Sequence, residues 1–214
     1  MLDFYHIFKN IKCIFLLYTI ILMNSCENKR VGDNVDHINS ISTLIEEGDI
    51  VFRRGEGLVS QIVLAHDIGG NYSHIGLVVC DNGKLKIAHS VPGEHDDSND
   101  FDRVKLDNVD IYFSSSYATK GAVKRIHISD EQKRKLSSKA LEIVARKVPF
   151  DHHYNLEDTS ELYCTEFVRH IYLTIGIDLT EGRRTNAYIP GMQGEYVMPS
   201  DIYNNEGLKL IYCF

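Results

Sequence analysis

The sequence lacks any stretch in which Lys and Arg cluster with interleaved aromatic residues, and its formal net charge is −7. Binding to nucleic acid depends on cationic side chains that neutralise phosphates, so the sequence predicts no nucleic-acid partner. Internal repeats and low-complexity tracts are also missing. Apolar residues make up 43% and charged residues 25% of the 214 residues. These values are ordinary for one folded domain with a buried core and additional short segments.

An apolar run of membrane-spanning length is missing too. The run from Cys13 to Met23 is shorter than the roughly 20 residues that a bilayer requires. Lysines precede this run and small or polar residues follow it, which is typical of a secretory signal. A buried helix is the alternative, but it would have to begin at the initiator methionine without a polar face. We therefore expect residues 1–25 to be a signal peptide.

The stretch Leu22–Cys26 resembles a bacterial lipobox, in which the Cys is lipidated and becomes the mature N-terminus. This resemblance implies an exported lipoprotein that Cys26 anchors to a membrane of the cell envelope, with plain secretion as the alternative. Residues 27–44 are polar without an apolar period, so we expect residues 26–44 to be the lipidated Cys and a tether. The folded domain is then expected over residues 45–214.

The sequence has few cysteines that could pair in disulfides. Without Cys13 and Cys26 the chain keeps Cys80, Cys164 and Cys213, and this odd number leaves at least one thiol unpaired. The count allows a disulfide between Cys80 and Cys213, but no other feature of the sequence supports it. The sequence therefore predicts no disulfide framework.

Hydrophobic patterning predicts an α+β fold, because hairpins come first along the chain and helices follow. Strands are expected over residues 50–52, 74–80, 85–89, 104–106, 122–128 and 208–213. Helices are expected over residues 58–65, from a capping box at Ser129 and Gln132 to about Lys147, and from Glu161 to a stop at Gly176.

Cys164 is expected near the start of the last of these helices. A thiol at a helix N-terminus faces unpaired backbone N–H groups and the positive end of the helix dipole, and both favour the thiolate. The same N–H groups can hold the oxyanion of a tetrahedral intermediate. We therefore expect a thiol of lowered pKa, although a small buried Cys in a helix is a common alternative.

Two histidines are candidates for the partners of this thiol. His74 opens an apolar strand, where its imidazole can reach another element and accept the thiol proton. His89 ends the next strand across the turn at residues 81–83, so it can orient the ring of His74. Each of the two is open to the alternative of an ordinary hydrogen-bonded His at a strand end.

Four short motifs carry a resemblance to a known family: Gly48–Val51, Ser73–Gly76, Tyr163–Val168 and Tyr196–Tyr203. In this order they resemble the YiiX/YaeF-like permuted papain-fold amidases, which are relatives of the NlpC-type cell-wall hydrolases. In ordinary papain-like enzymes the Cys precedes the His, whereas here the His comes first.

The resemblance covers nearly the whole expected domain. It implies a circularly permuted papain-like fold, an antiparallel sheet packed with helices, with Cys164 as nucleophile and His74 as base. The third position of this family is often Glu where this chain has His89, and NlpC-type relatives commonly use His there.

Other residues are weaker candidates for binding substrate or an oxyanion. Asp49 can belong to the site or only to a turn, and Tyr163 can line the oxyanion site or only pack. The loop Phe150–Tyr154 is aromatic and rich in His, so Tyr154 and its neighbours can form a substrate wall. Adjacent His residues in a strand would point to opposite faces, so we expect no metal, and we expect no cofactor.

The expected reaction is hydrolysis of an amide through a thioester on Cys164, with peptides of the cell wall as the favoured substrates. This substrate class rests on analogy, since fold does not determine function. A lipid-directed hydrolase or acyltransferase is one alternative, and an apolar channel that leads to Cys164 would favour it. A non-catalytic envelope binding module is the other, and it would require Cys164 and His74 to lie too far apart to couple.

Overall fold

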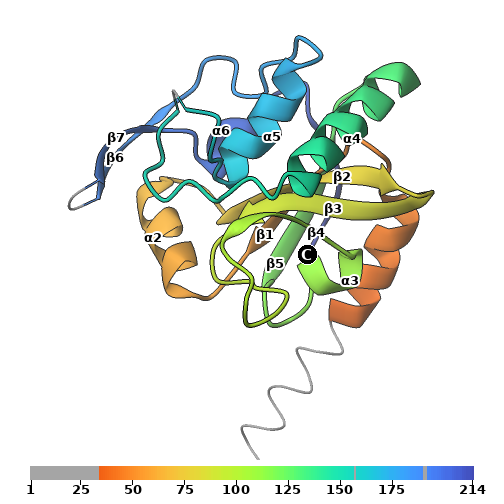
Figure 1. The fold of residues 1–214 in the computed structure, drawn as a ribbon, viewed down its shortest axis with the longest axis horizontal. Helices are drawn as coiled ribbons and strands as arrows, with labels where there is room; N and C mark the ends of the chain where they lie inside the picture. Colours follow the sequence, from red (N-terminus) through yellow and green to blue (C-terminus); the bar gives the residue numbers. More distant parts are fainter. Residues whose placement is uncertain (1–33, 157, 190–191) are drawn as a thin grey trace, which may run out of the picture.

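The computed structural model describes residues 34–156, 158–189 and 192–214 (Figure 1). The expected signal peptide and the expected lipidation site at Cys26 lie outside these residues. None of the described helices is long and apolar enough to cross a bilayer.

A six-stranded antiparallel sheet forms the centre of the fold, with strand order β4-β3-β2-β1-β5-β8. Its strands are β1 (Ile50–Arg54), β2 (His74–Asp81), β3 (Lys84–Val91), β4 (Arg103–Asp107), β5 (Lys120–Arg125) and β8 (Lys209–Cys213). The strands β6 (Thr185–Ile189) and β7 (Met192–Tyr196) form a separate hairpin. The register of β1 against β2 pairs Arg53 with His74, which places both at one end of the sheet.

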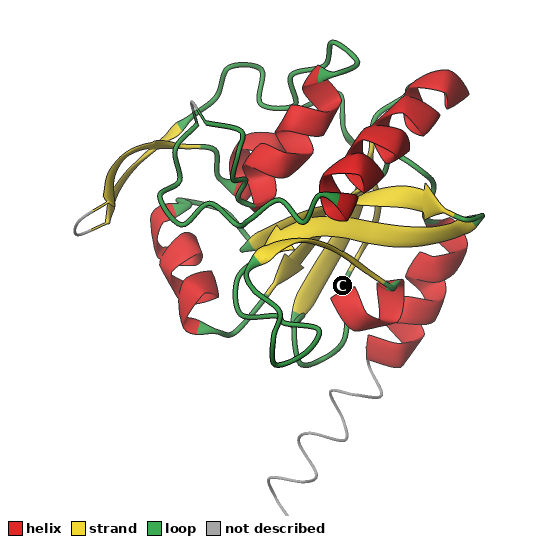
Figure 2. Ribbon diagram, viewed as in Figure 1, coloured by secondary structure: helices red, strands yellow, loops and turns green. Residues whose placement is uncertain are grey.

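Helices cover both faces of the sheet (Figure 2). Strand residues alternate between two cores: Ile50 and Phe52 of β1 belong to one, and Val51 belongs to the other. The first core includes residues of α4 (Asp130–Ala145) and α5 (Cys164–Leu173), and the second includes residues of α3 (Val109–Tyr112). Because the side chains of a strand alternate between its faces, α4 and α5 pack on one face and α3 on the opposite one. The remaining helices are α2 (Leu58–His66) and α6 (Pro199–Tyr203).

The expectation of a tether up to residue 44 is wrong for residues 34–44, which form a helix. Ile41 is fully buried, and Ile38, Ile41 and Ile45 belong to the core beside α3, so a spaced isoleucine pattern was missed among polar residues. The Asn34 side chain also donates hydrogen bonds to the carbonyls of Phe113 (2.8 Å) and Ala118 (3.0 Å). This helix is therefore part of the folded domain.

The expected α+β architecture is confirmed, with some differences at element ends. The capping box of Ser129 and Gln132 is present and opens α4. The strand expected over residues 122–128 lies at 120–125, and α5 begins at Cys164 instead of Glu161. The short helices α3 and α6 and the β6–β7 hairpin were not expected.

All three cysteines of the described part are free thiols: Cys80, Cys164 and Cys213. Cys80 lies on β2 and Cys213 on β8, with β1 and β5 between their strands. Adjacent strands are about 4.8 Å apart, so these two residues are far beyond the distance that a disulfide spans.

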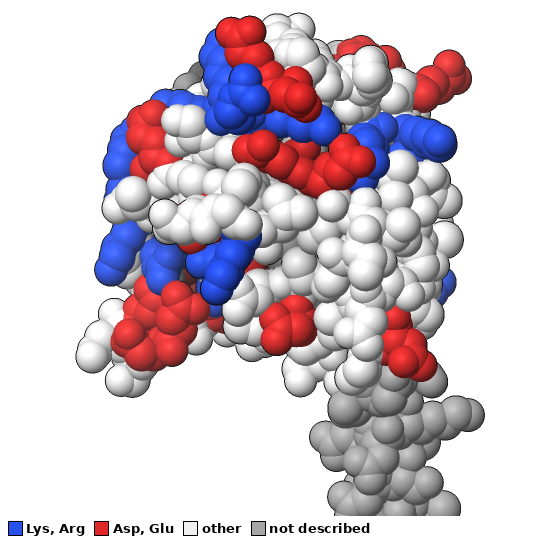
Figure 3. Space-filling view, turned by 90° about the vertical axis from the view of Figure 1, so that its right-hand side faces the viewer, with Lys and Arg blue, Asp and Glu red and all other residues white. Residues whose placement is uncertain are grey.

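Charged groups of both signs lie next to one another on the face shown in Figure 3, with broad uncharged areas between them. Ion pairs such as those of Arg125 and Lys133 with Glu46 are examples of this mixing in the described structure.

Candidate active site

Helix α5 places Cys164 at its first position. Tyr163 precedes it in an extended conformation (φ −86°, ψ 172°) and has no side-chain cap. The Glu166 carboxyl instead accepts a hydrogen bond from the backbone N–H of Tyr163, as the third residue of a capping box does. Burial raises the pKa of Glu166 to about 8. A neutral carboxyl so near the helix start does not oppose negative charge on Cys164.

The sulfur of Cys164 faces backbone N–H groups from two elements. The N–H groups of Cys164 and Thr165 come from α5, and that of Ile75 comes from β2. Their hydrogen bonds favour the thiolate, but burial is the larger effect and raises the pKa of Cys164 to about 11. The sequence-based expectation of a lowered pKa is therefore wrong. The helix start is present as expected, but the protein atoms packed around the half-buried Cys164 cost the charged form more.

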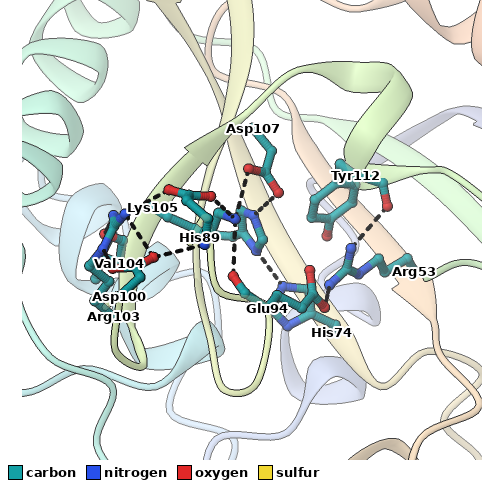
Figure 4. A network of polar contacts seen from close by, with 11 residues as sticks. Arg53, His74, His89, Glu94, Asp100, Arg103, Val104, Lys105, Asp107 and Tyr112 are labelled. Atoms are coloured by element: carbon teal, nitrogen blue, oxygen red, sulfur yellow. Dashed lines mark hydrogen bonds and ion pairs between the residues drawn. The ribbon is translucent and has the colours of Figure 1, made fainter. Parts of the chain in front are cut away.

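His74 and His89 are joined by a hydrogen bond of 2.9 Å between His74 Nε2 and His89 Nδ1 (Figure 4). The other ring nitrogen of His89 lies 3.0 Å from Oδ2 of Asp107, at the end of β4. Both histidines are buried, and His89 has no exposed surface. The three side chains thus form a continuous hydrogen-bonded chain from β2 through β3 to β4.

The charge on Asp107 determines the tautomers along this chain. Burial alone would raise the pKa of Asp107, but the hydrogen bond from His89 and the nearby Lys105 together lower it. The Lys105 ammonium lies 3.2 Å from the Asp107 carboxylate. An ionised carboxylate only accepts hydrogen bonds, so His89 Nε2–H donates to it and His89 Nδ1 accepts from His74 Nε2–H. The lone pair of His74 is then on Nδ1.

Both imidazoles are neutral in this environment. Burial is the main cause of the lowered pKa of His74, which is well below the ordinary value, and the charge on Arg53 and the neighbouring His89 lower it further. Burial also lowers the pKa of His89, although Asp107 opposes the shift. A neutral imidazole with a free Nδ1 is able to accept a proton.

A cavity of about 280 Å³ adjoins Cys164 and His74. Its lining is mainly apolar and aromatic, and among the residues that the structure describes no Asp, Glu, Lys or Arg side chain lines it. The lining residues are Val59, Ile62, Val63, Ser73, His74, Pro92, Phe150, His152, Tyr154, Tyr163, Cys164, Thr165, Tyr196, Val197, Met198 and Pro199. They come from α2, the start of β2, the residue after β3, the loop before α5 and the first two residues of that helix, and the segment that leads into α6.

Cys164 and His74 approach this cavity from opposite faces of the sheet. The ring of His74 packs against Tyr112 of α3, with 5.8 Å between centroids, whereas Cys164 belongs to α5. No hydrogen bond joins the two side chains within the described structure, although both line the same cavity. Catalytic hydrogen bonds are often long without substrate and tighten when it binds, so this arrangement permits coupling.

The weaker candidates separate into two groups. Tyr154 and Tyr163 line the cavity, and their ring centroids are 5.2 Å apart. The Tyr163 hydroxyl accepts a 3.0 Å hydrogen bond from the N–H of Val197 and so holds the opposite wall in place. Asp49 is not at the site, because it lies at the far end of β1 and forms an ion pair with Arg125 (2.6 Å).

Asp107 is the residue that the sequence analysis missed. The strand over residues 104–106 was expected, and Asp107 follows it directly. The register of β3 and β4 pairs Ile87 with Asp107 and His89 with Lys105. This pairing places the carboxylate beside His89 on the same face of the sheet, and the sequence alone did not supply the register.

The comparisons agree with this geometry. The model of the permuted papain-like amidase enzymes YaeF/YiiX, the C92 family, matches residues 44–212. The chain belongs to this family, so it is a papain-like cysteine hydrolase of the amidase kind, and the fold and family expected from the sequence are confirmed.

A solved structure is similar over most of the chain. It is described as the crystal structure of metalloprotein YiiX from Escherichia coli O157:H7, with a TM-score of 0.64 and 19% identity, covering 79% of this chain and 97% of that one. At this identity the likeness shows the fold. No curated protein matches the chain. In this chain, the described residues include no group of three His, Cys, Asp or Glu side chains arranged to hold a metal ion.

We expect Cys164 of the ligand-free protein to react slowly with iodoacetamide at about pH 8, because a pKa of about 11 leaves little thiolate there. The rate should rise as pH increases toward that pKa. Peptide mass spectrometry measures labelling at each cysteine, and the exposed thiol of Cys213 serves as an internal reference. Labelling of Cys164 that is complete and independent of pH from about pH 6 would contradict the raised pKa.

Proposed function

We propose that the protein hydrolyses an amide through a thioester on Cys164. His74 Nδ1 takes the thiol proton as the sulfur bonds to the carbonyl carbon. The proton then passes to the amide nitrogen, the C–N bond breaks and the amine leaves. His74 next takes a proton from water, which attacks the thioester, and the acid is released as the proton returns to the sulfur.

The observation that carries this proposal is the chain Asp107–His89–His74 beside the cavity that also reaches Cys164. It fixes the lone pair of the base on the one nitrogen of His74 that is not used within the chain. Because the thiol and the imidazole are both neutral, the proton moves as the sulfur attacks. His89 and Asp107 orient the base and stabilise the imidazolium that forms, as a third group does in other triads.

Backbone N–H groups are suited to hold the oxyanion. Those of Cys164, Thr165 and Ile75 converge on the sulfur from the helix start and from the neighbouring strand. Fixed donors in a site with little water stabilise developing negative charge without reorganisation.

The cavity favours a substrate with an apolar group next to the scissile amide. Its described lining contains many aromatic and aliphatic side chains and no carboxylate, ammonium or guanidinium group. Cell-wall peptides carry several charged groups, and the described lining residues include no Asp, Glu, Lys or Arg that could pair with them. We therefore rank an amide with an apolar acyl group above a cell-wall peptide as the substrate. The same apolar lining also favours the alternative of a lipid-directed enzyme.

An anchor in the envelope fits such a substrate. We propose that Cys26 is lipidated after removal of residues 1–25 and holds the enzyme at a membrane, since several acyl chains on one residue bind firmly. Mass spectrometry of the mature N-terminus tests this, with a lipidated Cys26 expected. A peptide that continues unmodified through Cys26 would reject the anchor.

Asp107→Asn should lower kcat by about 100-fold or more with the fold intact. The Asn amide can donate to His89 Nε2, which moves the proton of His89 to Nδ1 and removes the acceptor for His74. Asp49→Asn is the matched control, because it neutralises another buried, ion-paired carboxylate away from the cavity. Equal losses of kcat in the two folded variants would contradict a role of Asp107 in orienting His89 and His74.

Substrate class is tested by incubating the full-length chain with three sets of compounds: long-chain N-acyl amides, muropeptides and phospholipids. We expect release of amine from N-acyl amides, and no release by Cys164→Ala or His74→Ala. Turnover of muropeptides alone would restore the cell-wall assignment. Turnover by Cys164→Ala at the wild-type rate would reject the thioester mechanism.

A further inference from the structure

A buried guanidinium lies directly beside the histidine pair. Arg53 is only 2% exposed and pairs with His74 in the register of β1 and β2. Its Nη1 donates to the Tyr112 carbonyl (3.0 Å), and its Nη2 forms an ion pair with Glu94. A buried charge is costly unless it is paired, and the proposed reaction gives Arg53 no part, so its position calls for an explanation.

Aromatic rings connect this charge to both histidines. The guanidinium carbon lies 4.6 Å from the ring centroid of Tyr112 and 5.2 Å from that of Tyr117. The Tyr112 ring in turn packs edge-on against His89, with centroids 5.1 Å apart. Arg53, Tyr112 and both histidines are buried, although Tyr117 is partly exposed, so the field of Arg53 acts on the imidazoles with little screening.

The other charged groups around the histidines are already paired with one another. Asp107 faces His89 and Lys105, and Lys105 also contacts Asp96 (2.5 Å) and the Glu94 carbonyl (3.1 Å). One oxygen of the Glu94 carboxylate forms the ion pair with Arg53. The second oxygen is buried and has no hydrogen bond among the described residues. Arg53 and Glu94 are therefore a separate pair of opposite charges beside the hydrogen-bonded chain of Asp107, His89 and His74 (Figure 4).

We propose that Arg53 and Glu94 form an electrostatic positioning pair that keeps His74 and His89 unprotonated, so that His74 is ready to act as base. The inference rests on the proposed function, and neither residue touches the reacting atoms. Arg53 supplies positive charge that disfavours the imidazolium, and Glu94 limits this effect, because full repulsion would prevent His74 from accepting the proton at all.

The directions of the shifts agree with this role. After burial, the charge of Arg53 is the largest cause that lowers the pKa of His74, and it also lowers the pKa of His89. Glu94 acts on His89 in the opposite direction. The same charge of Arg53 lowers the pKa of Cys164, against the larger effect of burial.

The test is an NMR titration of histidine imidazoles in the full-length chain, with signals assigned by comparison with His74→Gln. Arg53→Met should raise the pKa of His74 by about 1 unit, because a neighbouring positive charge is lost. Glu94→Gln should lower the pKa of His89, because a neighbouring negative charge is lost. Arg53→Lys keeps the charge and should restore the wild-type titration even if some packing is lost.

Arg125→Met is the matched control, since it removes a guanidinium from the ion pair with Asp49 at the other end of β1. It should leave the titration of His74 unchanged. If Arg53→Met unfolds the protein, Glu94→Gln still decides the question, because it should lower the pKa of His89. An unchanged pKa of His74 in folded Arg53→Met, or a pKa of His89 that is unchanged or raised in Glu94→Gln, would overturn the proposal.

Labelling of Cys164 separates this inference from the proposed function. Arg53→Met should slow its reaction with iodoacetamide several-fold at about pH 9, and Arg53→Lys should not. These readouts need no substrate. If the pKa shifts are observed but no amide is hydrolysed, the electrostatic pair is supported and the proposed reaction is rejected. If amides are hydrolysed but the pKa values do not shift, the proposed reaction is supported and the electrostatic pair is rejected.

Discussion

A hydrogen bond between two imidazoles requires one ring to donate and the other to accept, and the site depends on this requirement. In the pair of His74 and His89, the carboxylate of Asp107 decides which ring donates and which ring accepts. The direction of the whole chain is set at its far end, on a strand two places away in the sheet. The sheet register, more than any residue at the cavity, therefore fixes the tautomer of His74.

This constraint explains why so many charges are buried on the α3 face. An ionised Asp107 needs a cation, and Lys105 on the same strand provides it. Arg53 in turn needs an anion, and Glu94 of the loop after β3 provides it. Each pair is nearly neutral as a unit, which limits the cost of burial. The arrangement keeps charge close to the imidazoles without leaving any one of them alone in the core.

The sequence predicted most of the elements that present the site, because their signals are local. Cys164 at a helix start, His74 at a strand start and the hairpin to His89 follow from periodicity and turn residues. The role of Asp107 depends on strand pairing, which hydrophobic pattern leaves undetermined. The pKa of Cys164 depends on how completely the fold surrounds the sulfur. The helix over residues 34–44 was missed because its few isoleucines lie among polar residues.

Helix α2 contributes no buried residue, although Val59, Ile62 and Val63 line the cavity. Leu58 is 78% exposed, so the helix leaves much of its apolar surface in water. Its C-terminal end is held more firmly, because Asp67 accepts hydrogen bonds from Ser200. Tilting α2 outward about that end would uncover little additional apolar area, and the hydrophobic free energy opposing such a tilt is small. The side of the cavity formed by α2 is therefore the one that yields most easily, and its movement would not disturb the hydrogen-bonded chain on the sheet.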